Sequence, residues 1–215
     1  SPLMVEKQGF KHFMLKEIYE QPQVIRDTLM GRISLDRGEV LLAETGIPEK
    51  IFRDVRKAVI IACGTSSHAG LIGKYFLESL AGIPADVEYA SEYRYRDFIL
   101  EKDALVIVIS QSGETADTLA ALRAAKGRAA ATLAVTNAVS SSIARESQGV
   151  LYTHAGPEIG VAATKTFTAQ LTALALVALG LAQAKRFGTK EDRLAVIEEL
   201  QRIPHKVERI LHRAG

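Results

Sequence analysis

Between Ala58 and Lys185 the chain alternates short apolar runs with longer segments whose apolar residues recur at helical spacing. The predicted strands are residues 58–62, 87–89, 104–109, 131–135 and 150–153, of which 58–62 and 104–109 are the clearest apolar runs. Short runs rich in Val, Ile and Leu are typical of parallel strands that are covered on both faces. Right-handed β–α–β units connect such strands. The alternation therefore predicts an α/β fold: a three-layer αβα sandwich with a five-stranded parallel sheet in the order 2-1-3-4-5.

The segments between and after these runs predict the helices of the two outer layers. We expect helices over residues 69–80, 91–98, 114–126, 141–146 and 164–185. The last contains the most apolar stretch of the chain, Leu171 to Ala182, which is about a dozen residues long. This is short of the ~20 residues that a membrane-spanning helix needs. We expect a buried helix that packs against the sheet on one side. Its other side could contact a second subunit.

Three regions follow from this pattern: a helical leader over 1–50, the sheet domain over 51–188, and a helical tail over 189–215. In the leader, a helix is predicted to start at Pro22 and run through Val24–Ile33, because proline suits the first turn of a helix. Residues 35–42 are predicted to form a second short helix, and Pro48 to begin another turn.

The tail is predicted to form two helical segments separated by Pro204. Its apolar residues keep a helical rhythm, with charged residues between them. These apolar residues are Leu194, Ile197, Leu200 and Ile203. We expect the tail to be a linker that leads toward a domain absent from this chain.

Composition excludes several partners and compartments. The 27 Lys and Arg nearly balance the 25 Asp and Glu, and no basic cluster occurs, so no nucleic-acid partner is expected. No segment reads as a signal peptide, and no membrane association is expected. The single cysteine, Cys63, fits a reducing compartment, and we expect a cytoplasmic location. Because the chain starts with Ser-Pro, we expect an excised or processed fragment.

Two loops rich in glycine and hydroxyl groups follow the first and third predicted strands. They are Cys63–Ser67 and Ser110–Thr115, and each precedes a predicted helix. In the 2-1-3-4-5 order, the strand order reverses between these two strands, and ligands bind beyond the carboxyl ends of strands at such a point. Helix N-termini, close backbone approach at Gly64 and Gly113, and hydroxyl donors together favour an anion such as a phosphomonoester.

Other interpretations of these loops stay open. Ser and Thr are also common helix N-caps, with no ligand involved. The loops lack the glycine patterns of P-loop and dinucleotide sites, and they lack the aromatic residues of a flavin site. Cys63 and His68 could form a nucleophilic pair, but no acid to orient the histidine is evident. The five histidines lack metal-binding spacing, so we expect no metal and no cofactor.

These loops resemble those of the sugar isomerase (SIS) domain, and further segments resemble the family of glutamine–fructose-6-phosphate aminotransferases. The segments are Lys16–Pro22 (KEIYEQP), Gly31–Ile33 (GRI), Glu78–Pro84 (ESLAGIP), Ser91–Arg96 (SEYRYR) and Glu158–Ala162 (EIGVA). The resemblance covers the chain from about Phe10 to the tail. It implies binding of fructose 6-phosphate or glucosamine 6-phosphate.

The resemblance also implies site residues. Those implied to hold the phosphate are Ser110, Gln111, Ser112 and Thr115. Thr65 and Ser66 would reach the sugar hydroxyls, and Val161 would contribute through its backbone. The family commonly has serine where this chain has Ala163, so we expect a weaker contact to the sugar there.

The resemblance implies a larger parent enzyme with a glutaminase domain and a second SIS domain, and it implies a homodimer. Since the family's catalytic residues lie in the second SIS domain, we expect no catalytic residue in this chain and no turnover by it. The imine-forming lysine of the family also lies there, so Lys165 is not expected to take that role. Two alternatives remain: a non-catalytic phosphosugar-sensing module and a flavodoxin-like electron carrier.

Overall fold

The computed structural model describes residues 7–214, so the first six residues of the predicted leader and Gly215 of the tail lie outside the described residues. Its central feature is a five-stranded parallel sheet with the order β4-β3-β5-β6-β7. The strands are β3 (Lys57–Ala62), β4 (Ala85–Tyr89), β5 (Ala104–Ser110), β6 (Ala131–Thr136) and β7 (Gly149–Tyr152). Numbered by their own sequence order, they lie 2-1-3-4-5, which confirms the predicted topology.

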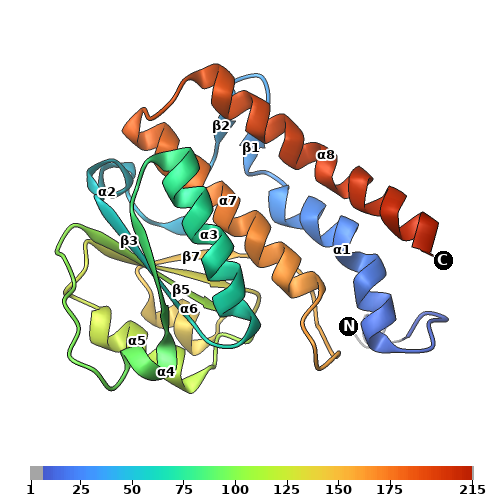
Figure 1. Ribbon diagram of the computed structural model, residues 1–215, viewed down its shortest axis with the longest axis horizontal. Helices are drawn as coiled ribbons and strands as arrows, with labels where there is room; N and C mark the ends of the chain where they lie inside the picture. The colour runs from blue at the N-terminus through green and yellow to red at the C-terminus, as the bar shows by residue number, and fades with distance from the viewer. Residues whose placement is uncertain (1–6, 215) are drawn as a thin grey trace.

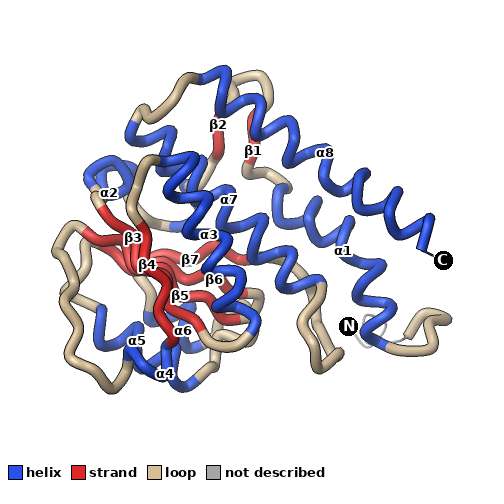
Figure 2. Tube along the Cα trace, in the orientation of Figure 1, coloured by secondary structure: helices blue, strands red, loops and turns tan. Residues whose placement is uncertain are grey.

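Helices cover both faces of the sheet, as Figures 1 and 2 show. On one face lie α3 (Thr65–Ala81) and α7 (Lys165–Lys185). On the other lie α4 (Ala90–Tyr93), α5 (Ala116–Ala125) and α6 (Ser142–Glu146). The predicted three-layer arrangement is therefore confirmed.

Alternate residues along each strand supply two separate apolar cores. Ile60 and Ile107 pack in the core under α3 and α7. Ile61 and Val108 point the other way, into the core with α4, α5 and α6. Every residue of β5 is buried, because this strand lies in the middle of the sheet with helices on both faces.

Helix α7 is the central helix of the molecule. By length and composition it is the one helix in the described part of the chain that could cross a membrane, with a mean hydropathy of 1.6. However, 72% of its most apolar window is buried inside the protein. The side away from the sheet contacts α1 (Phe13–Leu29) of the same chain, and α1 in turn contacts α8 (Lys190–Ala214). The side of α7 at which the sequence allows contact with a second subunit is therefore covered by the leader helix α1 of the same chain.

The predicted start of the leader helix at Pro22 is wrong, because α1 begins nine residues earlier at Phe13 and contains Pro22. Proline cannot donate the hydrogen bond that the carbonyl four residues before it would accept. The Gln21 side chain replaces that bond, since its Nε2 donates to the carbonyl oxygen of Ile18 at 3.0 Å. Pro22 is buried, and its packing adds to this compensation.

The short helix predicted over residues 35–42 is also wrong. A two-stranded hairpin stands there, formed by β1 (Ile33–Ser34) and β2 (Glu39–Val40). The turn ends at Gly38, whose positive φ of 62° suits glycine and whose N–H donates to the Leu35 carbonyl. A 3-10 turn, η2 (Ala43–Thr45), follows, and the turn predicted at Pro48 is confirmed as α2 (Glu49–Asp54).

The tail is one helix rather than two, because α8 continues through Pro204. An interior proline costs a helix about 3 kcal/mol. The predicted apolar stripe offsets this cost, since Ile197 is buried and both Leu200 and Ile203 pack against the main core. Pro204 is itself buried.

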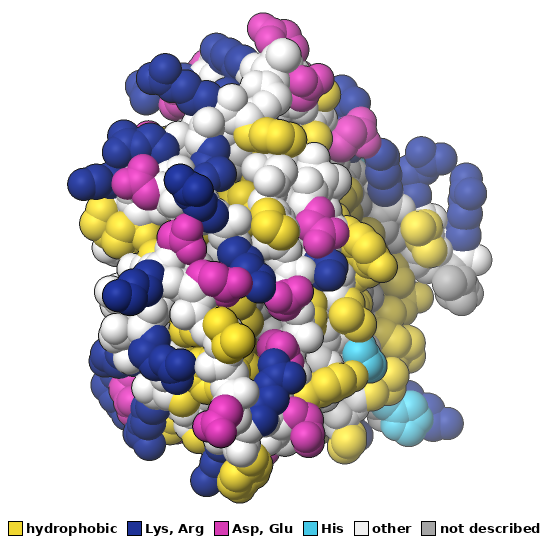
Figure 3. Space-filling model, turned by 60° about the vertical axis from the view of Figure 1, so that its left-hand side comes forward, with side chains coloured by type: hydrophobic (Ala, Val, Ile, Leu, Met, Phe, Trp, Pro, Cys, Tyr) yellow, Lys and Arg dark blue, Asp and Glu magenta, His cyan; other side chains and the backbone are white. Residues whose placement is uncertain are grey.

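Of the charged segment predicted as a helix over 91–98, only residues 91–93 are helical, as the end of α4. Beyond it the arginines form ion pairs within the chain: Arg94 with Asp117, and Arg96 with Glu88. On the face shown in Figure 3, acidic and basic side chains are intermixed rather than segregated.

The hydroxyl of Tyr93 offers a test of the second core. Burial raises the pKa of Tyr93 to about 12, and its oxygen has no hydrogen-bond partner among the residues that the structure describes. An unsatisfied buried hydroxyl stabilises nothing, so Tyr93→Phe should leave the free energy of unfolding unchanged or raise it by about 1 kcal/mol. Denaturant unfolding measures this.

The matched comparison is Thr28→Val. The Thr28 hydroxyl is fully buried and lies 2.6 Å from the Thr153 carbonyl oxygen, so its removal should cost about 1–3 kcal/mol. Equal losses for the two variants would contradict this account of the buried hydroxyls.

Candidate functional site

The two predicted loops emerge side by side at the carboxyl edge of the sheet. Strands β3 and β5 are neighbours, and the last residue of β3, Ala62, pairs with Ile109. From β3 the chain passes to β4 on one side and then returns to β5 on the other side. The point between the two loops is therefore the topological switch point at which ligands bind in open parallel sheets.

The loop after β5 is held in shape by its own hydroxyl groups. Ser110 is buried, and its Oγ accepts a hydrogen bond from the Gly113 N–H at 3.0 Å and lies 2.8 Å from Thr115 Oγ1. Gly113 has a φ of 65°, and a Cβ there would lie 2.0 Å from Ser141 Oγ. Only glycine fits this turn.

Capping does not account for the hydroxyls of these loops. Thr115 is the N-cap residue of α5, yet its side chain makes no capping hydrogen bond. Gly64 is the N-cap of α3, again without a side-chain cap. Both helices therefore begin with N–H groups that no N-cap side chain satisfies, and their positive dipole ends lie at the shared edge. This geometry suits an anion.

Exposure within the loops differs from residue to residue. Thr65 and Ser112 are exposed, whereas Ser66, Gln111 and Thr115 are half-buried. Thr65 and Ser66 belong to the first turn of α3, which begins four residues before the predicted helix over 69–80. Of the six predicted residues, Ser110 is the most buried.

Two carboxylates stand close to the loop after β5, and each has a partner. Glu114 accepts a hydrogen bond from the Ser142 N–H at 2.7 Å, and this bond holds the pKa of Glu114 below its usual range. Asp117, in the first turn of α5, forms an ion pair with Arg94 at 3.0 Å. These partners reduce the repulsion that an incoming anion would meet.

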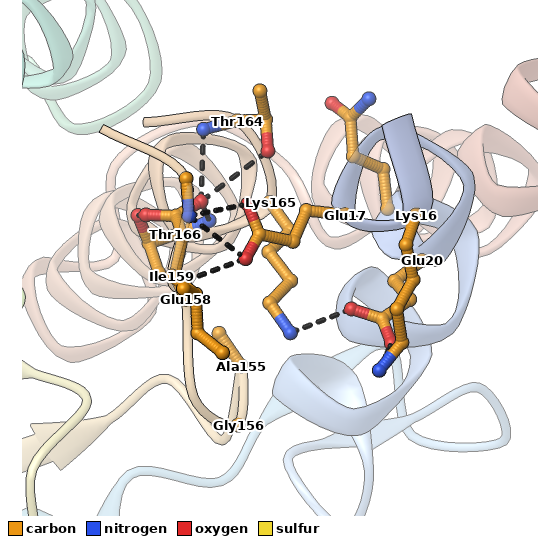
Figure 4. A network of polar contacts seen from close by, with 12 residues as sticks. Lys16, Glu17, Glu20, Ala155, Gly156, Glu158, Ile159, Thr164, Lys165 and Thr166 are labelled. Atoms are coloured by element: carbon orange, nitrogen blue, oxygen red, sulfur yellow. Dashed lines mark hydrogen bonds and ion pairs between the residues drawn. The ribbon is translucent and has the colours of Figure 1, made fainter. Parts of the chain in front are cut away.

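A third loop, between β7 and α7, contains the predicted residue Val161. Its end is fixed by Glu158, whose Oε1 accepts hydrogen bonds from the backbone N–H groups of Thr164 and Thr166 (Figure 4). Glu158 thus serves as the cap of α7, since the N-cap residue Thr164 makes no side-chain cap. A carboxylate at this end of a helix is favoured by the helix dipole.

Glu17 of the leader fixes the middle of the same loop (Figure 4). Its carboxylate is buried, and Oε1 accepts from the N–H of Ile159 at 2.5 Å and from that of Gly160 at 3.1 Å. A Cβ on Gly160 would lie 2.5 Å from Glu17 Oε2, so a larger residue there would displace the Glu17 carboxylate. The loop is therefore shaped by a residue more than 140 positions earlier in the chain.

Lys165 lies beneath this loop, in the first turn of α7. A cation is unfavourable at a helix N-terminus, but Glu20 lies 2.7 Å from Lys165 Nζ and also pairs with Lys16. Lys165 is buried in this ion pair. A nucleophilic amine would instead have to be neutral. The ion pair favours a structural role for Lys165.

The remaining predicted residues lie as follows. The side chain of Val161 is fully exposed, and the predicted contact of this residue is through its backbone. Ala163 is half-buried. Cys63 is half-buried and His68 exposed, and no hydrogen bond joins them within residues 7–214. In the same range, no group of three or more His, Cys, Asp or Glu side chains is placed to hold a metal ion.

Helix α7 is connected to the first turn of α3 through Gln170, whose Nε2 donates to Ser66 Oγ at 3.0 Å. Sequence reasoning did not identify Gln170, Glu17 or Glu158 as residues that shape the site. Glu17 and Glu158 do fall in two of the quoted motifs, KEIYEQP and EIGVA. Nothing in the sequence signals the contact between those motifs, because it depends on how α1 packs against α7.

Comparison with known proteins agrees with this geometry. The family model for the SIS domain matches residues 51–180. This match covers more than half of the chain, and the chain belongs to the SIS domain family.

More specific similarity extends over almost the whole chain. It is 53% identical over 206 residues to the glutamine–fructose-6-phosphate aminotransferase of Clostridium tetani, covering 96% of this chain and 34% of that protein. The corresponding protein of Aquifex aeolicus is 54% identical over 209 residues, covering 97% and 32%. The chain therefore spans about a third of the length of these curated relatives.

Solved structures show the same fold. The C-terminal domain of glucosamine-fructose-6-phosphate aminotransferase from Francisella tularensis has a TM-score of 0.87 and 43% identity, covering 93% of this chain and 55% of that one. A glucosamine-6-phosphate deaminase from Thermotoga maritima, at 22% identity and a TM-score of 0.65, covers 90% and 54% and shares the fold.

Replacing Glu17 tests the contact between the leader and the third loop. Glu17→Ala leaves the backbone N–H groups of Ile159 and Gly160 without their charged acceptor, so the free energy of unfolding should fall by about 1.5–3 kcal/mol. Gln23→Ala, on the exposed side of α1, is the control and should change it by less than about 0.5 kcal/mol. Equal stability of Glu17→Ala and the wild type would refute the role of this contact.

Proposed function

We propose that this chain binds the phosphate group of a hexose 6-phosphate in the pocket between the loops after β3 and β5. The observation that supports this most strongly is that the two loops are adjacent at the switch point. The Ser110–Thr115 loop has a tight turn that depends on the positive φ of Gly113. Helix N-terminal N–H groups would neutralise the phosphate charge, and Ser110, Gln111, Ser112 and Thr115 would donate hydrogen bonds to it. Neither a metal nor a cofactor is part of this proposal.

Fructose 6-phosphate and its product glucosamine 6-phosphate are the proposed ligands. Their support is the similarity to glutamine–fructose-6-phosphate aminotransferases over 96% of the chain. In this proposal Thr65 and Ser66 bind the sugar hydroxyls, and the backbone at Val161 contacts the sugar from the third loop. Ala163 offers no hydroxyl, so it would leave one sugar contact unmade.

The parent protein is proposed to convert fructose 6-phosphate and glutamine to glucosamine 6-phosphate and glutamate. This chain would contribute the binding of the sugar phosphate, while a glutaminase domain and a second SIS domain supply the chemistry. The side chains around the loops fit this division, since Glu17 and Glu158 are occupied by backbone N–H groups and Lys165 by Glu20.

A cytoplasmic location and a homodimer are part of the same proposal. The single cysteine supports a reducing compartment. The outer side of α7 is already covered by α1, so a dimer would form through another surface.

Removing two loop hydroxyls tests the proposed phosphate site. The Ser112→Ala, Thr115→Ala double variant should lose about 3 kcal/mol of binding free energy for glucosamine 6-phosphate, which weakens the affinity by more than 100-fold. Calorimetric titration measures this. Ser79→Ala, an exposed hydroxyl on α3, is the control and should bind like the wild type. Equal affinity of the double variant and the wild type would refute the site.

The division of labour has its own test. The purified 215-residue chain should bind glucosamine 6-phosphate but should not convert fructose 6-phosphate and glutamine. An assay for glutamate and glucosamine 6-phosphate at high protein concentration measures this. Turnover above the background without protein would overturn the proposal that the catalytic groups lie elsewhere.

A further inference from the structure

A buried amide lies directly behind the proposed sugar end of the pocket. Gln170 is 3% exposed and belongs to α7. Its Nε2 donates to Ser66 Oγ at 3.0 Å, across the contact between α7 and α3. The two helices pack closely one turn further on, where a Cβ on Gly73 would lie 2.9 Å from Leu174 Cδ1. Gln170 therefore has a fixed position relative to Ser66.

The hydrogen bond from Gln170 determines what Ser66 can do. A serine hydroxyl has one proton to donate and two lone pairs that accept. Because Gln170 occupies a lone pair of Ser66 Oγ, the Ser66 proton is directed to a different acceptor. The neighbouring Ser67 shows the contrast, since its hydroxyl donates to the Gly64 carbonyl within the chain at 2.7 Å. Ser66 is half-buried at the pocket, where a ligand oxygen could accept its proton.

Stability alone does not explain a glutamine at this position. Among the residues that the structure describes, no donor lies within hydrogen-bonding distance of the buried Gln170 Oε1. A buried carbonyl oxygen without a donor costs free energy, and an apolar side chain of the same length would avoid this cost. Local violations of this kind concentrate at functional sites.

We propose that Gln170 is a positioning residue that sets the sugar specificity of this pocket by orienting the Ser66 hydroxyl toward an oxygen of the bound sugar. The inference rests on the proposed function, and it adds a residue that acts only through Ser66. Gln170 contributes nothing to the phosphate end, which lies at the loop after β5. Its removal should therefore weaken the binding of a sugar phosphate and leave the binding of inorganic phosphate unchanged.

The test compares two ligands across a double-mutant cycle. Gln170→Met keeps the length of the side chain and removes the amide. It should bind glucosamine 6-phosphate about tenfold more weakly than the wild type, bind inorganic phosphate equally well, and melt at the same or a higher temperature. Ser66→Ala should show the same selective loss, and the double variant should lose no more than Ser66→Ala alone. A purely structural Gln170 would instead lower the melting temperature and affect both ligands alike.

Each other result has a defined meaning. Unchanged glucosamine 6-phosphate affinity in Gln170→Met, or fully additive losses in the double variant, overturns the role of Gln170 while the proposed function stands. Failure of the wild type to bind either ligand overturns both the role of Gln170 and the proposed function.

A measurement on the unmutated chain keeps the inference testable if the variant fails to fold. The side-chain amide resonances of Gln170 should shift with glucosamine 6-phosphate and not with inorganic phosphate, and resonances that shift with neither ligand overturn the inference.

Discussion

The parallel pairing of β3 with β5 is the constraint on which the rest of the structure depends. Because Ala62 pairs with Ile109, the segments that follow these strands leave the sheet at the same edge and next to each other. Both segments lead directly into helices, so two helix N-termini point at one place. The proposed anion site is thus a consequence of strand order, and the hydroxyl groups of the loops would add hydrogen-bond donors to it.

The third loop depends on contacts between distant parts of the chain. Glu17 holds it from the leader and Glu158 holds it from within, while Glu20 compensates the buried Lys165 below it (Figure 4). These carboxylates are bonded to N–H groups or to a cation, as buried charges must be. The leader is consequently part of the packed structure around the site, although the SIS family model begins only at residue 51.

The sheet could be predicted from the sequence because the inner strands β3 and β5 are short apolar runs with clear boundaries, whereas the edge strand β4 contains Asp86 and Glu88 and begins two residues before its prediction. The two loops could be predicted to lie side by side because the common 2-1-3-4-5 order makes the first and third strands neighbours. Two of the errors occurred where a proline was taken as a boundary: Pro22 and Pro204 both lie inside helices. In the first case Gln21 replaces the missing hydrogen bond, and in the second the buried stripe around Ile197 outweighs the proline. Tertiary contacts of this kind, like those of Glu17 and Gln170, have no local signal in the sequence.

The central claim is that the loops after β3 and β5 form one pocket for a phosphate group. Backbone amide chemical shifts measured during a titration with inorganic phosphate test it most directly. The account predicts that the N–H signals of residues 64–67 and 111–116 shift together, with a single dissociation constant. Shifts confined to one of the loops, or located at the opposite edge of the sheet, would contradict it.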